Sequence, residues 1–195
     1  MLTLCFKIKE ELFLVRKKVH KKQHILAAAR ELLIKEGFSF ITARSVAGHM
    51  GISTQPIYLE FKNMEELKLT LLETTHESLE NQYLSKLQTS NNCANFGLNY
   101  IELAKSNKEL YLSLYVDQHS YGQELQQLLF TSFQKSILDD KNYVAASNEQ
   151  LKNLYMNLWI VATGIASLSI SGILNHTEEQ LISIFETVEK NSRIN

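Results

Sequence analysis

Proline is almost missing from this sequence of 195 residues, which contains only Pro56 and seven glycines. Hairpins and tight turns depend on these two residue types, so their scarcity excludes a protein built mainly of hairpins and favours long helices with short connections. No stretch alternates between apolar and polar residues in the manner of a half-buried strand. The sequence therefore predicts an all-α fold of about nine helices.

Cysteine is also scarce, with Cys5 and Cys93 and no C-x-x-C pair. Two isolated cysteines provide no disulfide framework, which is typical of a reduced, cytoplasmic protein. The sequence lacks H-E-x-x-H, G-x-S-x-G, P-loop and G-x-G-x-x-G motifs. His20 and His24 have the helical spacing of two metal ligands, but no third ligand accompanies them. We therefore expect no enzyme, no cofactor and no metal site.

Long hydrophobic runs are absent as well. The longest weakly polar stretch, 158–174, is shorter than the ~20 apolar residues of a spanning helix, and Thr163 and three serines interrupt it. This pattern predicts a buried helix of a soluble protein without a membrane partner.

The first fourteen residues differ in character from those that follow. The segment MLTLCFKIKEELFL is apolar at both ends and precedes the basic run VRKKVHKKQ, the reverse of the order in a secretory signal. Residues 9–11 can be encoded by a purine-rich sequence that resembles a bacterial ribosome-binding site. One hypothesis is that 1–14 is a leader or mis-assigned start, and that the natural chain begins near Val15. An intact Met1 peptide in protein from the native source would contradict it.

Charge is unevenly distributed, although the net charge is only −1. Residues 1–62 hold 11 Lys/Arg and 5 Asp/Glu (+6), and residues 63–195 hold 9 and 16 (−7), which sum to −1. A basic N-terminal third indicates that this end meets a polyanion. Charge alone leaves open the alternative of chance clustering on solvated faces.

Helical spacing and capping residues predict where each helix lies. Caps are expected at Thr42, Ser53 and Asn63 in the N-terminal third, and at Ser106, Ser147 and Thr177 later in the chain. The predicted helices lie at about 20–37, 43–50, 54–61, 64–87, 94–105, 108–116, 123–138 and 148–174, with a ninth after Thr177.

The single proline falls in the stretch GISTQPIYLEFKN. Proline is tolerated in the first turn of a helix, so with Ser53 as N-cap Pro56 would be the third residue of a short helix. The polar residues Thr54 and Gln55 then stand at the entrance of that helix. A short helix, a turn and a second short helix form a helix-turn-helix, which offers the start of its second helix to the major groove of DNA.

An ordered set of residues carries this pattern further, from Ile25 to Leu67. It comprises the alanines 28–29, Gly37-Phe38, Thr42, Val46-Ala47, Gly51-Ile52-Ser53, Tyr58, Phe61 and the KN-EEL of 62–67. This set resembles the DNA-binding domain of the tetracycline-repressor (TetR) family of bacterial regulators. The sequence departs from the family at Met64, where a lysine is frequent, and at Gln55-Pro56, which replaces a pair of small residues.

The resemblance implies a DNA-binding domain at 15–63 and a helical effector-binding and dimerisation domain at 64–195. Thr42 and Tyr58 would hydrogen-bond phosphates, and Lys62 would pair with one. Glutamine pairs bidentately with adenine and arginine with guanine, so Gln55 and Arg44 suit base edges. The expected DNA-binding residues are Arg16, Lys17, Lys18, Lys21, Lys22, Thr42, Arg44, Ser53, Thr54, Gln55, Tyr58 and Lys62.

Two of these assignments have structural alternatives. The basic residues from Arg16 to Lys22 have no acid nearby in the sequence, which suits backbone or minor-groove contact. They could equally be a solvated helix entrance. Tyr58 could be a core tyrosine, although Ile57 and Phe61 are better core candidates.

The larger domain holds most of the aromatic residues, and in the family this region encloses an effector pocket. Tyr100, Tyr115, His119 and Trp159 are the expected pocket residues, because each combines an apolar body with a polar tip. An ordinary aromatic core is the alternative. These residues carry no obvious fixed charge, which favours a neutral or apolar effector.

Dimerisation through the last two helices is a further implication of the resemblance. Small residues interleaved with aliphatic ones on the eighth helix would allow close approach of a second copy, with intrachain core as the alternative. The expected interface residues are Ile165, Leu168, Gly172, Leu181, Ile184, Phe185 and Val188.

The leading hypothesis is a ligand-responsive repressor that binds a palindromic operator DNA as a homodimer and is released by a small-molecule effector. One alternative is a TetR-like coactivator or enzyme partner that acts by protein–protein contact. Another is a helical enzyme or carrier that uses the aromatic interior. Salt-sensitive DNA affinity would separate the first hypothesis from the others.

Overall fold

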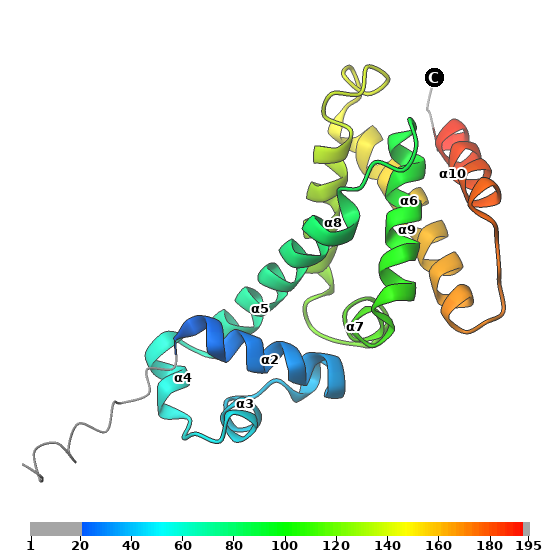
Figure 1. Ribbon diagram of the computed structural model, residues 1–195. Coiled ribbons are helices and arrows are strands. Elements are labelled where there is room, and N and C mark those ends of the chain that lie inside the picture. Colours follow the sequence, from blue (N-terminus) through cyan, green and yellow to red (C-terminus); the bar gives the residue numbers. More distant parts are fainter. Residues whose placement is uncertain (1–20, 193–195) are drawn as a thin grey trace, which may run out of the picture.

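The computed structural model describes residues 21–192 (Figure 1). Within this range the chain forms nine α-helices and no strand, which confirms the predicted all-α class. The helices are α2 (Lys22–Glu36), α3 (Ala43–Met50), α4 (Gln55–Glu60), α5 (Met64–Leu79), α6 (Asn92–Ser106), α7 (Lys108–Tyr111), α8 (Gly122–Ser136), α9 (Asn148–Ile170) and α10 (Glu178–Ser192). Three shorter helical segments join them: the 3₁₀ turn η1 (Phe38–Phe40) and the π-helical turns η2 (Glu80–Leu84) and η3 (Leu112–Val116).

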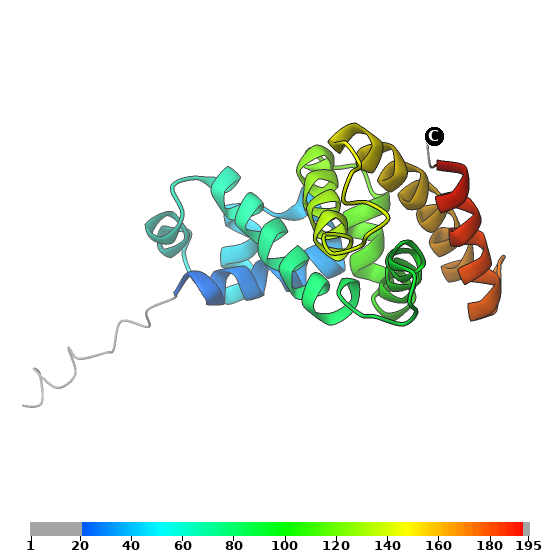
Figure 2. The same cartoon turned by 90° about the horizontal axis from the view of Figure 1, so that it is seen from above.

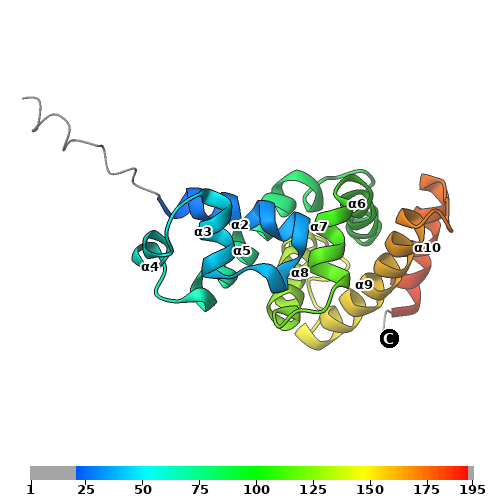
Figure 3. The same ribbon diagram turned by 90° about the horizontal axis from the view of Figure 1, so that it is seen from below.

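The molecule is elongated, with a small head of α2, α3 and α4 at one end (Figures 1 and 2). A larger bundle of α6 to α10 forms the other end, and α5 runs from the head into it. Within the bundle, α6 packs against both α9 and α10. Figure 3 shows α9 and α10 side by side at the end of the molecule farthest from α4.

The head has its own apolar core. Ile25, Ala29 and Leu33 repeat every four residues on α2 and are completely buried. Val46 of α3 and Ile57 of α4 are buried with them. Each buried aliphatic side chain of this size contributes about 1.5–3 kcal/mol, so a few such residues hold three short helices together.

The start of α4 differs from the prediction. Its N-cap is Thr54, not Ser53, and the Thr54 side chain makes no capping bond. A cap at Ser53 would face Pro56 three residues later, and proline has no N–H to donate. Pro56 is therefore the second residue of α4, still within the first turn where proline is tolerated.

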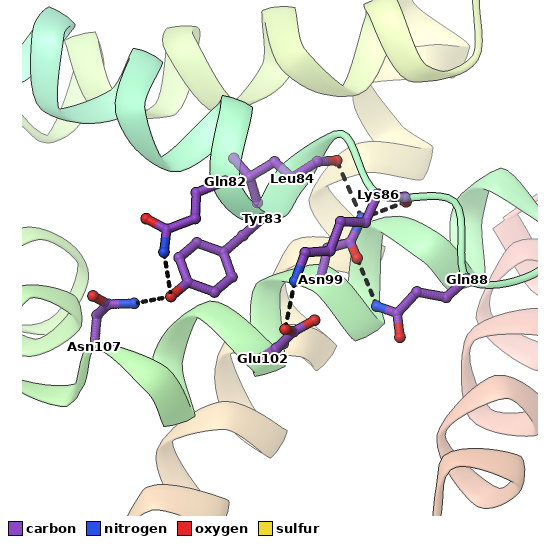
Figure 4. Close-up of polar contacts among 8 residues, drawn as sticks. All are labelled: Gln82, Tyr83, Leu84, Lys86, Gln88, Asn99, Glu102 and Asn107. Atoms are coloured by element: carbon purple, nitrogen blue, oxygen red, sulfur yellow. Dashed lines mark hydrogen bonds and ion pairs between the residues drawn. The ribbon is translucent and has the colours of Figure 1, made fainter.

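The connection from α5 to α6 also differs, because α5 ends at Leu79 rather than near residue 87 and continues as η2. Asn99 of α6 is completely buried and donates to the carbonyl oxygens of Leu84 at 3.2 Å and Lys86 at 2.8 Å (Figure 4). Its own oxygen accepts from Gln88 at 2.6 Å. These bonds satisfy carbonyl groups at the end of the helix, so the chain turns here instead of continuing.

The predicted N-cap at Ser106 is wrong. Helix α6 continues through Ser106, and α7 begins after Asn107 without a side-chain cap. The boxes predicted at the starts of α9 and α10 are confirmed, since Ser147 and Thr177 exchange bonds with the glutamines three residues later.

Helix α6 lies at the centre of the bundle, and every residue from 93 to 101 is buried. The Phe185 ring of α10 lies directly against Gly97, where an added Cβ would come within 2.2 Å of a ring atom. A helix buried on all sides needs such a small residue where another ring approaches its backbone.

Helix α9 is the one helix between residues 21 and 192 that is long and apolar enough to cross a membrane by length and composition alone. It packs along α6 and α10, and Leu158, Ala162 and Ala166 are completely buried. It ends at Ile170, earlier than the predicted 174, and Gly172 follows in a left-handed conformation with φ of 75°.

Candidate nucleic-acid interface

The N-terminus of α3 is fixed by a reciprocal capping box. The Ser45 N–H donates to the Thr42 hydroxyl at 3.1 Å, and the Thr42 N–H donates to the Ser45 hydroxyl at 3.0 Å. The Ser45 hydroxyl donates in turn to the Phe40 carbonyl oxygen at 2.6 Å. Because its backbone is fixed in this way, Thr42 presents an exposed side chain at a defined position.

The turn between α3 and α4 depends on Gly51, which has φ of 66° and ψ of 34°. This left-handed conformation suits glycine and ends α3. The N–H of Gly51 donates to the Gly48 carbonyl at 3.1 Å, and that of Ile52 donates to the Ala47 carbonyl at 3.0 Å. The turn thus fixes the direction in which α4 leaves.

Helix α4 buries one face and exposes the other. Ile57 is buried in the head core, whereas Thr54 and Gln55 are exposed at the start of the helix. Tyr58 is 54% exposed, so it is not a core tyrosine. A polar, exposed entrance above a buried anchor is the arrangement that a reading helix requires.

The start of α5 stands beside this face. Asn63 accepts from the Glu66 N–H at 2.9 Å, and Glu66 accepts from the Lys62 N–H at 2.7 Å. The bond from Lys62 holds the pKa of Glu66 below its usual value, and Lys22 adds to this effect. The Lys62 side chain remains exposed, while its backbone is fixed.

The sequence shows no acidic residue near Lys22, but the fold places one beside it. Its Nζ lies 3.4 Å from Glu66 and 4.8 Å from the centre of the Phe61 ring. Glu66 lies 44 positions later in the sequence, so only the fold brings the two together. The Lys22 side chain therefore links α2 to α5.

The remaining DNA-binding candidates divide into two groups. Arg16, Lys17 and Lys18 lie outside the described residues, as does segment 1–14. The structure places the others on the exposed surface of the head: Lys21, Thr42, Arg44, Ser53, Thr54, Gln55, Tyr58 and Lys62.

Leu59 was not among the expected residues, although it is 73% exposed on α4. It follows Gln55 by four positions, so the two side chains share one face of the helix. That spacing was visible in the sequence and could have identified it. Met64, by contrast, packs partly buried against the core, which accounts for an apolar residue at the start of α5.

Three of the four expected pocket residues lie together inside the bundle. The Tyr100 ring is 5.4 Å from the Tyr115 ring, and Trp159 stacks on Tyr155 at 5.7 Å. Burial, followed by the nearby Tyr111 and Tyr115 phenols, raises the pKa of Tyr100 well above its usual value. The Tyr100 phenol is therefore a neutral hydrogen-bonding group.

His119 lies elsewhere, at the junction of head and bundle. Its ring stacks on Phe38 at 5.2 Å, and its Nε2 lies 2.8 Å from the Leu114 carbonyl oxygen. Tyr121 packs on the same Phe38 ring at 5.0 Å and donates to Glu65 of α5 at 2.8 Å. Burial and this bond raise the pKa of Tyr121 to about 12. This junction was not foreseen from the sequence, because its members are far apart in the chain.

Some of the expected dimer residues are buried in the protomer, and others are exposed or half-buried. Ile165, Leu181 and Phe185 are buried within the protomer, and Phe185 fills the space beside Gly97, so they form intrachain core. Leu168 is 38% exposed on α9. Gly172 is exposed, whereas Ile184 and Val188 are half-buried. Two isoleucines of the same region, Ile160 and Ile173, are also exposed.

Between residues 21 and 192, no group of three His, Cys, Asp or Glu side chains is placed to hold a metal ion.

Comparisons with known proteins agree on the head and on the overall fold. Residues 25–70 match the profile of the bacterial regulatory proteins of the tetR family. A TetR-family protein from Vibrio parahaemolyticus is 18% identical, with a TM-score of 0.62 over 87% of this chain and 96% of that one. The flavonoid-responsive regulator FrrA is 19% identical, with a TM-score of 0.58 over 89% and 95%. The fatty acid degradation regulator FadR from Bacillus halodurans is 12% identical, with a TM-score of 0.59 over 91% and 96%. None of the curated proteins matches this sequence.

An exposed helix-turn-helix on a small head, joined to a helical bundle, is the fold of TetR-family transcriptional regulators. The matched profile covers the head itself, from Ile25 in α2 to Thr70 in α5. The head is thus similar to that of the TetR family of bacterial regulatory proteins. The solved structures share its fold over most of the chain, including the bundle.

Proposed function

We propose that this protein is a ligand-responsive repressor that binds a palindromic operator as a homodimer and leaves it when a small molecule binds the bundle. The exposed face of α4, held between the capped ends of α3 and α5, carries this proposal. The protein works in the cytoplasm and is not an enzyme. Residues 15–63 form its DNA-binding domain, and residues 64–195 form the effector-binding and dimerisation domain.

On DNA, the two ends of the reading face have different roles. Thr42 and Tyr58 donate to phosphate oxygens and Lys62 pairs with one, which fixes the position of the head. Arg44, Thr54 and Gln55 approach base edges, where arginine selects guanine and glutamine selects adenine. The basic residues before α2 add phosphate contacts, so affinity falls steeply as salt rises.

The dimer is supported by apolar side chains that stay exposed on α9 and just after its end. Ile160 is 61% exposed and Ile173 is 70% exposed, with Leu168 between them along the chain. A second copy that covers this region would bury them and place the two heads for half-sites ~34–36 Å apart. Ile165, Leu181 and Phe185 are buried within the protomer and would not contact a second copy directly.

Release by a ligand requires that the ligand favour one arrangement of the heads over another. The contact of Phe38 with His119 and Tyr121 joins the head to the bundle. Through this contact, a ligand bound in the bundle would change the position of the head. The names of FrrA and FadR connect those two structural relatives with flavonoids and fatty acids. Small organic molecules are therefore the effectors to test first.

The first experiment is selection of bound fragments from the host genome, followed by gel shift on the selected sites. Wild type would be compared with Tyr58→Phe and Lys62→Ala, and Lys141→Ala in the exposed α8–α9 connection serves as control. We expect a palindromic site, weaker binding by both head variants, and a salt slope about one unit smaller for Lys62→Ala. The control should bind like wild type.

The alternative is a coactivator or enzyme partner that acts by protein contact. Absence of any enriched fragment at low salt would contradict the repressor and favour this alternative. Equal binding by wild type and both head variants would instead show that DNA meets another surface.

A further inference from the structure

Among the described residues 21–192, η3 and α9 each place inside the bundle one buried hydrogen-bond donor without a partner. The hydroxyl of Tyr115 and the indole N–H of Trp159 are both shielded from solvent and unpaired. The indole N–H approaches the Tyr100 hydroxyl, but without the geometry of a hydrogen bond. An unpaired buried donor is unfavourable, and folded proteins satisfy most such groups. Each donor is thus a position where an acceptor is missing.

Flat aromatic walls surround these donors. The Tyr115 ring is 5.4 Å from Tyr100 and 5.5 Å from Tyr111. Trp159 lies nearly parallel to Tyr155, with an interplanar angle of 14°. Aromatic rings stack favourably on other flat systems, so the walls suit a planar guest better than a flexible chain.

The neighbouring hydroxyls are already paired. The Tyr111 hydroxyl lies 3.3 Å from the Ser167 hydroxyl, and Thr163 donates to the Tyr100 hydroxyl at 3.3 Å. The polar contacts of these two tyrosines are made with α9, and none involves a charged side chain. A carboxylate placed here would be buried without a counter-charge, which is unfavourable.

Tyr115 also has a special place in the chain. It lies on the π-helical turn η3, and such turns are frequent at functional sites. The connection that follows η3 carries His119 and Tyr121, whose rings pack on Phe38 of the head. A guest that engages Tyr115 therefore acts four to six residues from the contact between bundle and head.

We propose that the effector is a flat, uncharged molecule with acceptor oxygens, which inserts beside Tyr115 and Trp159 and accepts a hydrogen bond from each. The inference rests on the proposed function, because it names the class of effector for the same regulator. Insertion separates the rings and moves η3 together with the junction that it precedes.

The test uses three small probes on the full chain. Chromone is flat and has two acceptor oxygens, naphthalene has the same two-ring shape without them, and decanoate is aliphatic and anionic. Trp159 is the only tryptophan of the chain, so its fluorescence reports binding at this place. We expect chromone to bind more tightly than decanoate.

Two tyrosine variants test the hydrogen bond itself. Tyr115→Phe removes the unpaired hydroxyl. It should weaken the binding of chromone about 3- to 10-fold and leave the binding of naphthalene unchanged. Tyr111→Phe removes a hydroxyl that is already paired and should change chromone less than about 2-fold. Without probe, Tyr115→Phe should melt at or above the wild-type temperature, because the lost hydroxyl has no partner.

Several results would overturn the proposal. One is that chromone does not bind up to its solubility, and another is that decanoate binds more tightly than chromone. A third is that Tyr115→Phe weakens the binding of chromone and of naphthalene equally. The fourth is that Tyr115→Phe melts at a lower temperature than the wild type. DNA binding is measured on the same samples by gel shift. DNA binding without chromone binding would overturn only the effector class, and chromone binding without DNA binding would overturn only the repressor.

Discussion

The head and the bundle differ in where their polar groups find partners. In the head, the start of α3 is satisfied by residues three positions apart, Thr42 and Ser45. In the bundle, buried groups reach across the fold, as where Asn91 donates to Glu189 at 2.7 Å across 98 positions. The start of α3 in the head is therefore fixed by nearby residues, whereas such buried polar groups of the bundle find partners only in the complete fold.

This difference suits the two roles. A head with locally satisfied helix ends keeps its exposed side chains in place while the rest of the molecule moves. A bundle whose polar groups depend on distant partners responds as a unit when one contact changes. Changes in the bundle should thus have larger effects on stability than changes in the head.

The largest effect is expected from Gly97→Ala in the bundle. The new methyl group would lie 2.2–2.4 Å from three atoms of the buried Phe185 ring, so this ring or α10 must shift. Overpacking of this kind costs roughly 3 kcal/mol. Urea unfolding followed by Trp159 fluorescence would measure the loss.

The matched control is Gly48→Ala on the exposed side of α3, where nothing lies within 4 Å of the new methyl group. Alanine is favoured over glycine in a helix by up to about 1 kcal/mol, so this variant should be neutral or stabilised. Phe185→Leu added to Gly97→Ala should restore part of the stability. Equal stability of the two alanine variants would contradict the packing of α6 on α10.

Asn99→Leu is expected to lower the free energy of unfolding by about 2–3 kcal/mol. The substitution keeps the size of the side chain but leaves the carbonyl groups of Leu84 and Lys86 without their partner (Figure 4). Asn81→Leu makes the same chemical change at an exposed position and should alter stability little. Similar urea midpoints for both variants would show that the buried bonds are not needed.

These residues also explain how far the sequence predicts the fold. The caps at Thr42 and Asn63 follow from neighbours three residues away, so they are readable from the sequence and are confirmed. The end of α5 is not readable, because Asn99 lies 20 positions beyond Leu79 and only the folded chain brings it there. The cap at Ser53 is a local error, since the missing N–H of Pro56 was visible.

The candidate sites likewise include features set by neighbouring residues and features set by distant contacts. The exposed positions of Tyr58 and Gln55 follow from the helix-turn-helix pattern, which is local. The place of His119 depends on Phe38, which lies 81 positions earlier, and the burial of Phe185 depends on a glycine in another helix. Side-chain type alone could not distinguish these residues from a pocket or an interface.

A smaller effect, about 1 kcal/mol, is expected in the head from Thr42→Ala, which removes the cap of α3. Thr42→Ser keeps the hydroxyl and should retain both stability and DNA affinity. Thermal unfolding and hydrogen exchange at the Ser45 amide would measure the change. A loss of protection in the bundle as large as that in α3 would contradict the independence of the head.

The smallest effect concerns pH and the contact between α5 and helix α8 of the bundle. His76 is buried on α5, with its Nε2 2.9 Å from the Ser132 hydroxyl, and burial lowers its pKa below the usual 6.5. Glu80 opposes this shift and Lys135 adds to it. The unfolded chain therefore takes up the proton first as the pH falls. Stability is fully present above the unfolded pKa and declines below it.

Linkage limits this decline to about 0.7 kcal/mol between pH 7 and pH 6 for a single histidine with an unfolded pKa near 6.5. Urea unfolding at half-unit steps of pH would measure it. His76→Gln should flatten the curve in this window, because glutamine does not titrate, whereas His24→Gln on the exposed surface of α2 should leave the wild-type slope intact. A slope that survives His76→Gln would place the titrating group elsewhere. A slope that disappears with His24→Gln would move the pH sensitivity from the bundle to the head and reverse the comparison between them.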